Sequence, residues 1–278
     1  MDRQARGPAI AFDFETALDS PDAAPGFNVY RPADLPAAVA ATGQPLPVVV
    51  WANGGCTRAD FAWATLMERW AKGGFVVLAL SGNAGFTFLD GTTVEHHGQL
   101  IDWAMEQAEF KDMLDLDRIV AAGNSCGGVT AMGLAAVDER VSAVFVLSGS
   151  SAVGATDRNV VDAITVPVGF IVGNEREDIA APNAGSDYEA LSLDIPAMLI
   201  NRSSGDHFLV STDPAVLEEE ADISLHWMDL ALYGTREAFE QLSDDKRCER
   251  CTDGVWSMKM RNLEALLQPE AVGTAANP

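Results

Sequence analysis

The chain has 278 residues, of which 48% are hydrophobic, enough to bury a sizeable core. Its 18 Lys and Arg residues against 41 Asp and Glu give a formal net charge of −23, and a field of that sign repels nucleic acid and anionic lipid surfaces. We therefore expect no nucleic-acid partner, and we interpret the acidic surface as serving solubility or salt tolerance. No apolar run is long enough to cross a bilayer, so we expect no membrane insertion.

Segments rich in Pro, Gly and Ala lie near both ends of the chain, and we interpret them as peripheral loops and a tail around one compact unit. We predict a single domain over 1–278. Two amphipathic segments, 9–14 and 27–30, are expected to pair antiparallel at one edge of a sheet. The predicted parts are edge strands and loops at 1–46, the core at 47–210, and C-terminal helices with a tail at 211–278.

From residue 47 onward, short apolar runs alternate with segments of helical periodicity. Continuous apolar runs of this length are typical of strands buried on both faces. The pattern predicts an α/β fold with a mostly parallel central sheet and helices on both faces. The expected strands are 46–51, 75–80, 119–122, 141–147, 166–172 and 197–200, and the expected helices are 61–72, 93–110, 213–221, 224–232 and 235–242.

The motif Gly-Asn-Ser-Cys-Gly at 123–127 follows a short apolar strand and leads into a helical stretch of small residues at 129–136. A G-x-S-x-G sequence also arises by chance, so its place between a strand and a helix is what favours function. Glycines on both sides allow the sharp turn that exposes a serine hydroxyl. Ser125 is therefore a candidate nucleophile.

A serine hydroxyl needs a base to take its proton and a carboxylate to orient that base. Of the four histidines, His96, His97 and His226 are expected on a solvated helix face or at a helix start. His207 differs, because it lies in a loop rich in Ser and Gly directly after the strand at 197–200. Catalytic groups of open α/β sheets collect at such strand ends, so His207 is the candidate base.

The acid is expected between Ser125 and His207 in chain order, on the loop after another strand. The segment after the strand at 166–172 carries competing carboxylates, of which we favour Asp178 and place Glu175 second. Spacing alone does not decide between them.

An acyl-transfer site also needs donors for the developing oxyanion. The backbone N–H of Cys126, the residue after the nucleophile, is one candidate, and that of Cys56, beside Gly55 in the glycine-containing loop after the strand at 46–51, is the other.

Taken together, these segments resemble the α/β-hydrolase superfamily, and within it the dienelactone-hydrolase-like and cutinase-like or polyester-hydrolase-like esterases. The resemblance covers roughly 47–208 and rests on 47–56, 74–77, 118–128, 172–182 and 206–208. It implies an α/β-hydrolase fold and a serine esterase that needs no cofactor. In that family a loop of the pattern Gly-Asn/Glu-x-x-Asp-x-Ile-Ala-Pro carries the acid, which supports Asp178, and the residue before Phe208 matches the base.

The chain departs from that family at both oxyanion positions, where the family often has Met and an aromatic residue and this sequence has Cys126 and Cys56. We hypothesise that the two form a disulfide, which requires a Cα separation of roughly 4.4 to 6.8 Å; two buried free thiols are the alternative. Cys248 and Cys251 have metal-like spacing but lack a second pair of ligands, so we expect a local disulfide or two free thiols and no metal.

Two disulfides would favour an oxidising compartment, so we expect a secreted or periplasmic protein whose leader has been removed, with a cytoplasmic one as the alternative. Phe86 and Phe88 follow a strand on the catalytic edge, where they either line a substrate pocket or pack the loop. Gly55 and Phe208 are further candidate substrate contacts. No long apolar lid interrupts the core, which favours an open cleft for short or bulky esters.

We expect the partner to be a small-molecule or polymeric ester, and the oligomeric state stays open. The leading hypothesis is a serine esterase. An acyltransferase or a peptidase on the same triad, or a catalytically silent member used for binding, are the alternatives.

Overall fold

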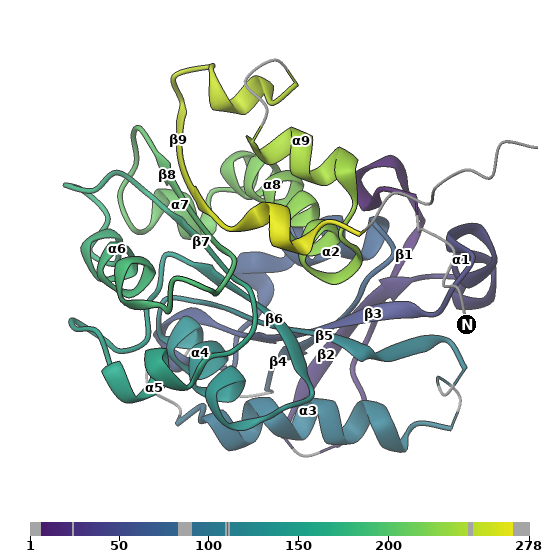
Figure 1. The fold of residues 1–278 in the computed structure, drawn as a ribbon. Helices are drawn as coiled ribbons and strands as arrows, with labels where there is room; N and C mark the ends of the chain where they lie inside the picture. Colours follow the sequence, from purple (N-terminus) through teal and green to yellow (C-terminus); the bar gives the residue numbers. More distant parts are fainter. Residues whose placement is uncertain are drawn as a thin grey trace, which may run out of the picture.

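Strands that are apolar on both faces form the middle of the molecule. The structure, a computed structural model, describes residues 7–23, 25–82, 91–108, 110, 112–243 and 247–268, and within them nine strands form one sheet in the order β1-β2-β4-β3-β5-β6-β7-β8-β9 (Figure 1). The six central strands run parallel: β4 (Val76–Leu80), β3 (Leu46–Ala52), β5 (Leu114–Asn124), β6 (Val141–Leu147), β7 (Val168–Val172) and β8 (Ala197–Arg202). The predicted α/β class with a mostly parallel sheet is confirmed.

The two edges of the sheet are antiparallel. At one edge β1 (Thr16–Asp19) pairs with β2 (Phe27–Pro32), which pairs with β4. The prediction of a strand at 9–14 is wrong, because Ala9–Ala11 form a 3₁₀ helix, η1, whose buried first residue donates its N–H to Asp229. At the other edge β9 (Trp256–Arg261) pairs with β8, whereas only helices and a tail were expected beyond residue 211.

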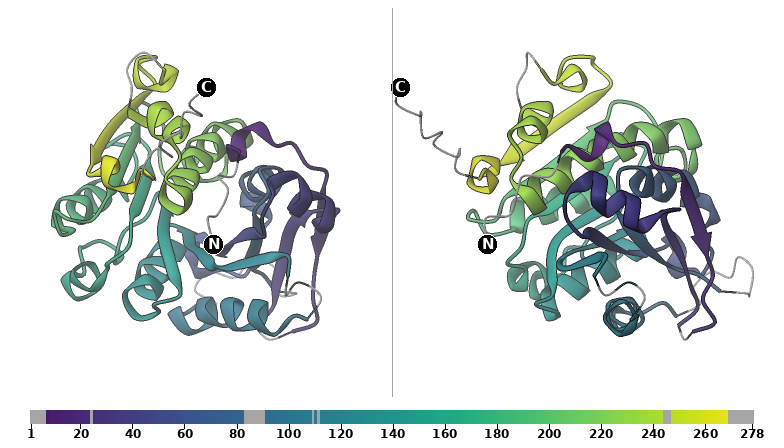
Figure 2. Two further views of the ribbon diagram at one scale, coloured as in Figure 1. Left: turned by 45° about the vertical axis from the view of Figure 1, so that its right-hand side comes forward. Right: turned by 90° about the vertical axis from the view of Figure 1, so that its right-hand side faces the viewer.

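Helices cover both faces of the sheet (Figures 1 and 2). One face carries α1 (Leu35–Thr42), α3 (Val94–Glu106), α4 (Cys126–Val137), α5 (Arg158–Ala163) and α6 (Ala181–Ala190). The other carries α2 (Ala64–Lys72), α8 (Pro214–Tyr233) and α9 (Arg236–Ser243). The described residues also form shorter elements: α7 (Leu209–Thr212), η2 (Gly54–Cys56), η3 (Phe61–Trp63), η4 (Glu249–Cys251) and η5 (Leu263–Leu266).

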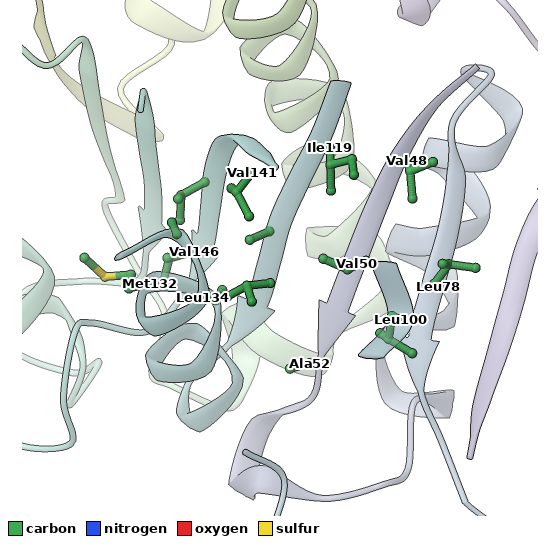
Figure 3. Close-up of a cluster of buried hydrophobic side chains, with 14 of the residues drawn as sticks. Val48, Val50, Ala52, Leu78, Leu100, Ile119, Met132, Leu134, Val141 and Val146 are labelled. Carbon is green, nitrogen blue, oxygen red and sulfur yellow. The ribbon is translucent and has the colours of Figure 1, made fainter. Parts of the chain in front are cut away.

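Alternate residues of each central strand supply the two layers of the core. In β3, Val48 and Val50 pack toward α3 and α4, whereas Val49 and Trp51 pack toward α2 and α8. Figure 3 shows the first of these layers, in which Leu100 of α3 and Leu134 of α4 meet the strands. Because both faces of the sheet are buried under helices, the strands appear in the sequence as continuous apolar runs. Polar groups can therefore be placed only at the strand ends.

Helix α8 is a single element where the periodicity predicted two. The Asp213 side chain caps its start by accepting from the N–H groups of Ala215 and Val216, and Gly234 ends it in the left-handed conformation. In its middle the Ser224 hydroxyl donates to the Ala221 carbonyl and accepts from the Trp70 indole, so its polar atom is satisfied within the helix interface. The helix therefore continues through residues 222 and 223, where the sequence pattern predicts a break between two helices.

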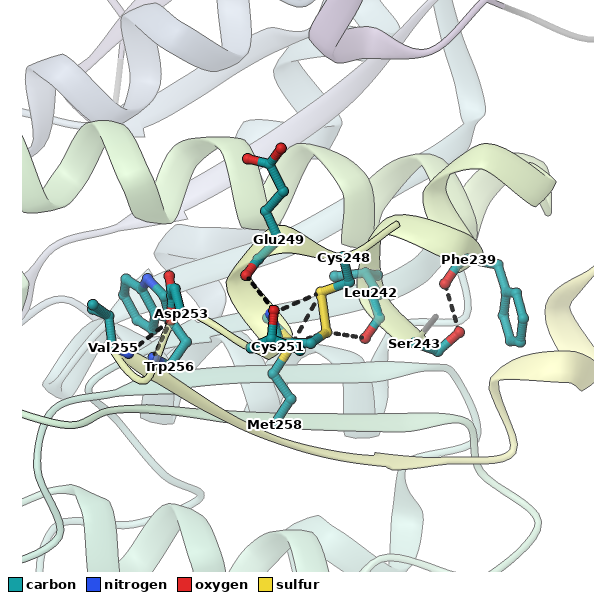
Figure 4. Close-up of a disulfide and its surroundings, with 11 residues drawn as sticks. Phe239, Leu242, Ser243, Cys248, Glu249, Cys251, Asp253, Val255, Trp256 and Met258 are labelled. Carbon is teal, nitrogen blue, oxygen red and sulfur yellow. Dashed lines mark hydrogen bonds between the residues drawn. A yellow bond between two sulfur atoms is a disulfide. The ribbon is translucent and has the colours of Figure 1, made fainter. Parts of the chain in front are cut away.

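A short disulfide lies beside the last strand (Figure 4). Cys248 and Cys251 have Cα atoms 5.3 Å apart, and the Cys251 sulfur lies 3.5 Å from the Leu242 carbonyl oxygen and 3.2 Å from the Met258 sulfur. The bond therefore joins η4 into the contact between α9 and β9, and it is the local disulfide that the sequence allowed. None of the helices in the described ranges combines the length and apolar character that a membrane span needs.

Candidate active site

Ser125 occupies the sharp turn between β5 and α4. Its φ of 50° and ψ of −116° lie in a region of backbone conformation that residues other than glycine rarely adopt. Such a conformation costs about 1–3 kcal/mol, and residues that adopt it cluster at functional sites. The flanking glycines are required by space: a Cβ at Gly123 would lie 2.3 Å from the Gly127 carbonyl oxygen, and one at Gly127 would lie 1.9 Å from that of Ala52. The G-x-S-x-G motif thus has a steric reason here.

Three side chains from three strand ends meet in one hydrogen-bonded chain. The Ser125 hydroxyl, after β5, lies 3.1 Å from Nε2 of His207, in the loop after β8. Nδ1 of His207 lies 2.8 Å from Oδ1 of Asp178, in the loop after β7. A hydroxyl, an imidazole and a carboxylate in this order can move a proton from the serine to the histidine.

Asp178 is buried but fully hydrogen-bonded. Its Oδ2 accepts from the Ser148 hydroxyl and the Gly173 N–H, both at 2.9 Å, and Oδ1 also accepts from the Ala180 N–H at 2.9 Å. Burial acts to raise the pKa of this carboxyl, but the hydrogen bonds from His207 and from the two N–H groups outweigh it and hold the pKa below its ordinary value. The carboxylate is therefore charged at neutral pH. Glu175, the second candidate acid, is exposed.

Ser148 is a member of the site that sequence reasoning missed. It follows β6 directly, is fully buried and has a φ of 44°, and its N–H donates to the Ile171 carbonyl at 2.7 Å. These contacts hold its hydroxyl against the Asp178 carboxylate. The available signal was its position, since β6 is the strand between those that carry Ser125 and Asp178.

The two candidate oxyanion residues are joined covalently. Cys56 and Cys126 form a disulfide with a Cα separation of 5.2 Å, within the range required. Because each amide nitrogen is one bond of about 1.5 Å from its Cα, the two nitrogens lie within about 8 Å of each other. Cys126 is the first residue of α4, where N–H groups lack partners within the helix. Cys56 ends η2, and its neighbour Gly55 has a φ of 63°.

Asn53 shapes the loop that carries Cys56 from the inside. This fully buried side chain accepts from the Trp51 indole at 2.9 Å and donates to the carbonyls of Thr57, at 3.1 Å, and Leu80, at 2.5 Å. The loop base is thereby tied to β3 and to the end of β4.

A small pocket of about 60 Å³ opens beside the nucleophile. Its lining includes both Ser125 and His207, and its larger apolar members are Val129, Val153 and Ile179. Phe208 is not part of it; that ring is 71% exposed, with its centroid 6.1 Å from that of the His207 imidazole. Phe86 and Phe88 lie outside the described residues.

Two of the three remaining histidines lie in other surroundings than expected. His97 is fully buried with Nε2 2.8 Å from the Val50 carbonyl oxygen, and burial lowers its pKa to about 4. His226 is also buried, and burial again lowers the pKa to about 4. The expectation of a solvated helix face is wrong for both. His96 stands at the start of α3, where it forms a capping box with Thr93. In the part of the chain that the structure describes, no cluster of three or more His, Cys, Asp or Glu residues could hold a metal ion.

No protein-family model matches the chain, and no curated protein matches it in sequence. The site geometry is therefore the evidence on its chemistry. It consists of a strained serine at a helix start, a histidine within hydrogen-bond distance of that serine, and a charged, buried carboxylate that accepts from the histidine.

Proposed function

We propose that the protein is a serine hydrolase that cleaves carboxylic esters through an acyl-enzyme. The observation that carries the proposal is the continuous contact from Ser125 through His207 to Asp178, with distances of 3.1 and 2.8 Å. Three polar side chains separated by 53 and 29 residues along the chain meet without any covalent link between them. The sharp turn at Ser125, where the residue is partly exposed, supports the same role.

In the proposed reaction the Ser125 oxygen attacks the ester carbonyl while its proton passes to Nε2 of His207. Asp178 accepts the Nδ1–H and stabilises the imidazolium that forms. The carbonyl oxygen gains negative charge near the N–H groups of Cys126 and Cys56. The intermediate then collapses, the alcohol leaves with the proton from His207, and a water activated by the same imidazole releases the acid.

The pocket beside Ser125 supports a short acyl group. At about 10–15 Å³ for each water-sized position, 60 Å³ holds about four to six such positions. That space suits acyl groups of about two to four carbons. A longer chain would have to continue over the exposed side chains of Val153 and Ile179 at the pocket rim.

The two disulfides fit an oxidising environment, so we place the protein outside the cytoplasm. The expected partner is a small-molecule or polymeric ester. Acyl transfer and peptide cleavage use the same triad, and a silent binding protein would keep the fold without the turnover.

A chromogenic ester series tests for turnover, which a silent binding protein would lack, and for the length of the acyl group. We expect p-nitrophenyl acetate and butyrate to be cleaved at kcat/KM values well above those of the octanoate and palmitate. Ser125→Ala and His207→Ala should each lose about 10⁶-fold in kcat, as in other Ser-His-Asp enzymes. Equal rates for the wild type and Ser125→Ala would refute the proposal that the protein is a hydrolase. A preference for palmitate would refute only the assignment of a short acyl group.

A further inference from the structure

The Cys56–Cys126 disulfide connects two loops that the reaction needs in a fixed relation. One end follows the nucleophile directly, and the other lies on η2, which packs against α4 from the loop after β3. The bond spans 70 residues of sequence, whereas Cys248 and Cys251 are only three residues apart. Both Cys56 and Cys126 are partly exposed, so the pair lies at the edge of the core and not within it.

The backbone at Cys56 has a conformation that the chain does not favour by itself. Gly55 and Cys56 have consecutive φ values of 63° and 50°, in the left-handed region that non-glycine residues seldom adopt. The hydrogen bonds of Asn53 and Thr57 hold the loop on either side of this pair. At Cys56 itself the described contacts are the disulfide and a hydrogen bond of 3.1 Å from the Thr92 hydroxyl to its carbonyl oxygen.

We propose that the Cys56–Cys126 disulfide is a positioning element of the catalytic cycle, and that its reduction slows turnover in a folded protein. The inference rests on the proposed function. When the bond is intact, the Cys56 amide is held opposite the Cys126 amide, where both face the developing oxyanion. When it is reduced, the segment at 55–56 can leave the left-handed conformation, and one donor is lost from the transition state while the ground-state ester contacts remain.

The chemistry of the switch is a two-electron reduction. With a water-soluble phosphine as the reductant, the S–S bond breaks and two S–H bonds form with the hydrogens of one water, while the phosphine leaves as its oxide. Reoxidation by a small disulfide reverses the change, since it forms the protein S–S bond and releases two small thiols. Cys56 and Cys126 act through the backbone here, and neither thiol takes part in bond cleavage of the ester.

The test compares two matched double variants, Cys56→Ser/Cys126→Ser and Cys248→Ser/Cys251→Ser, with the wild type, each with and without the phosphine at 25 °C. We expect the first variant to lose at least about tenfold in kcat, up to the 10²–10³-fold that removal of one oxyanion donor costs, with KM changed less than threefold. We expect the second variant to keep the wild-type kcat and to lose it on reduction as the wild type does. Reoxidation should restore kcat in both proteins that retain Cys56 and Cys126.

The fold is followed by near-ultraviolet circular dichroism in the same samples. A reduced wild type that keeps wild-type kcat would overturn the proposal, as would a rise in KM at constant kcat. Loss of the near-ultraviolet signal in step with activity, in the reduced wild type or in the first variant, would also overturn it, because the bond would then serve folding. The proposed function fails separately, if the oxidised wild type has no activity above Ser125→Ala.

Discussion

Substitution of Asp178 by Asn tests the electrostatic part of the site. Four donors face the Asp178 carboxylate: the His207 Nδ1–H, the Ser148 hydroxyl and the N–H groups of Gly173 and Ala180. An amide has only one oxygen to accept from them, and its NH₂ group must face at least one N–H. If the NH₂ turns toward His207, Nδ1 has to accept and Nε2 carries the proton, so the imidazole cannot take the proton of Ser125.

We expect Asp178→Asn to lower kcat by about 10⁴-fold, the loss caused by the wrong tautomer in another triad. This is smaller than the loss expected for Ser125→Ala, because the nucleophile remains. The variant should also be less stable by about 1–3 kcal/mol, since a buried N–H is left without its acceptor. Initial rates with p-nitrophenyl butyrate and urea unfolding measure the two effects.

The matched control is Glu175→Gln, which removes an exposed carboxylate from the same loop. We expect it to keep the wild-type kcat within twofold. A wild-type rate for Asp178→Asn together with a large loss for Glu175→Gln would refute the assignment and move the acid to Glu175.

Three further predictions concern Ser148, the glycine after the nucleophile and the buried His226. Ser148→Ala should lower kcat about tenfold with a small change in KM, because the Asp178 carboxylate loses a hydrogen bond worth about 1.5–3 kcal/mol. An unchanged kcat in steady-state assays would show that Ser148 has no role in the site. Gly127→Ala should be destabilised by at least about 3 kcal/mol in urea unfolding, since its Cβ would lie 1.9 Å from a carbonyl oxygen. Gly185→Ala in α6, which has open space around it, should be stabilised by about 0.5–1 kcal/mol. Similar stabilities for the two variants would contradict the steric account. His226 has a folded pKa of about 4 against an ordinary value of 6.5, so at pH values between the two the unfolded state binds more protons than the folded state. The contribution of this group to the free energy of unfolding is therefore lost as the pH falls from about 6.5 to 4. The slope of the free energy of unfolding against pH should be shallower in His226→Gln, and an equal slope would contradict the burial of His226 as a neutral group.

The central sheet could be predicted from sequence because its strands are buried on both faces. Residues such as Val48 and Val49 pack on opposite sides of β3, so apolar runs appear without interruption. Strand β9 was missed for the complementary reason. Only Trp256 is buried in it, and the exposed Ser257 and Lys259 broke the apolar pattern that marks a buried strand.

The residues that meet at the site could be named from their places at strand ends, because parallel strands bring their carboxyl ends to one edge. Ser125, Asp178 and His207 follow the predicted strand ends at 122, 172 and 200 by three, six and seven residues. Ser148 could not be distinguished in this way from any other polar residue after a strand, since its role depends on a hydrogen bond across 30 residues. The burial of His97 and His226 was missed because an imidazole among polar helix neighbours reads as solvated, and tertiary packing decides otherwise.

The measurement that tests the central claim most directly is covalent labelling with a fluorophosphonate, followed by peptide mass spectrometry. A fluorophosphonate reacts with a serine whose proton can pass to a neighbouring base, so the label reports the activated hydroxyl independently of the natural substrate. We predict one adduct, on Ser125, formed quickly in the wild type, much more slowly in Asp178→Asn and not at all in His207→Ala. An adduct on another residue, or no adduct on the folded wild type, would contradict the account.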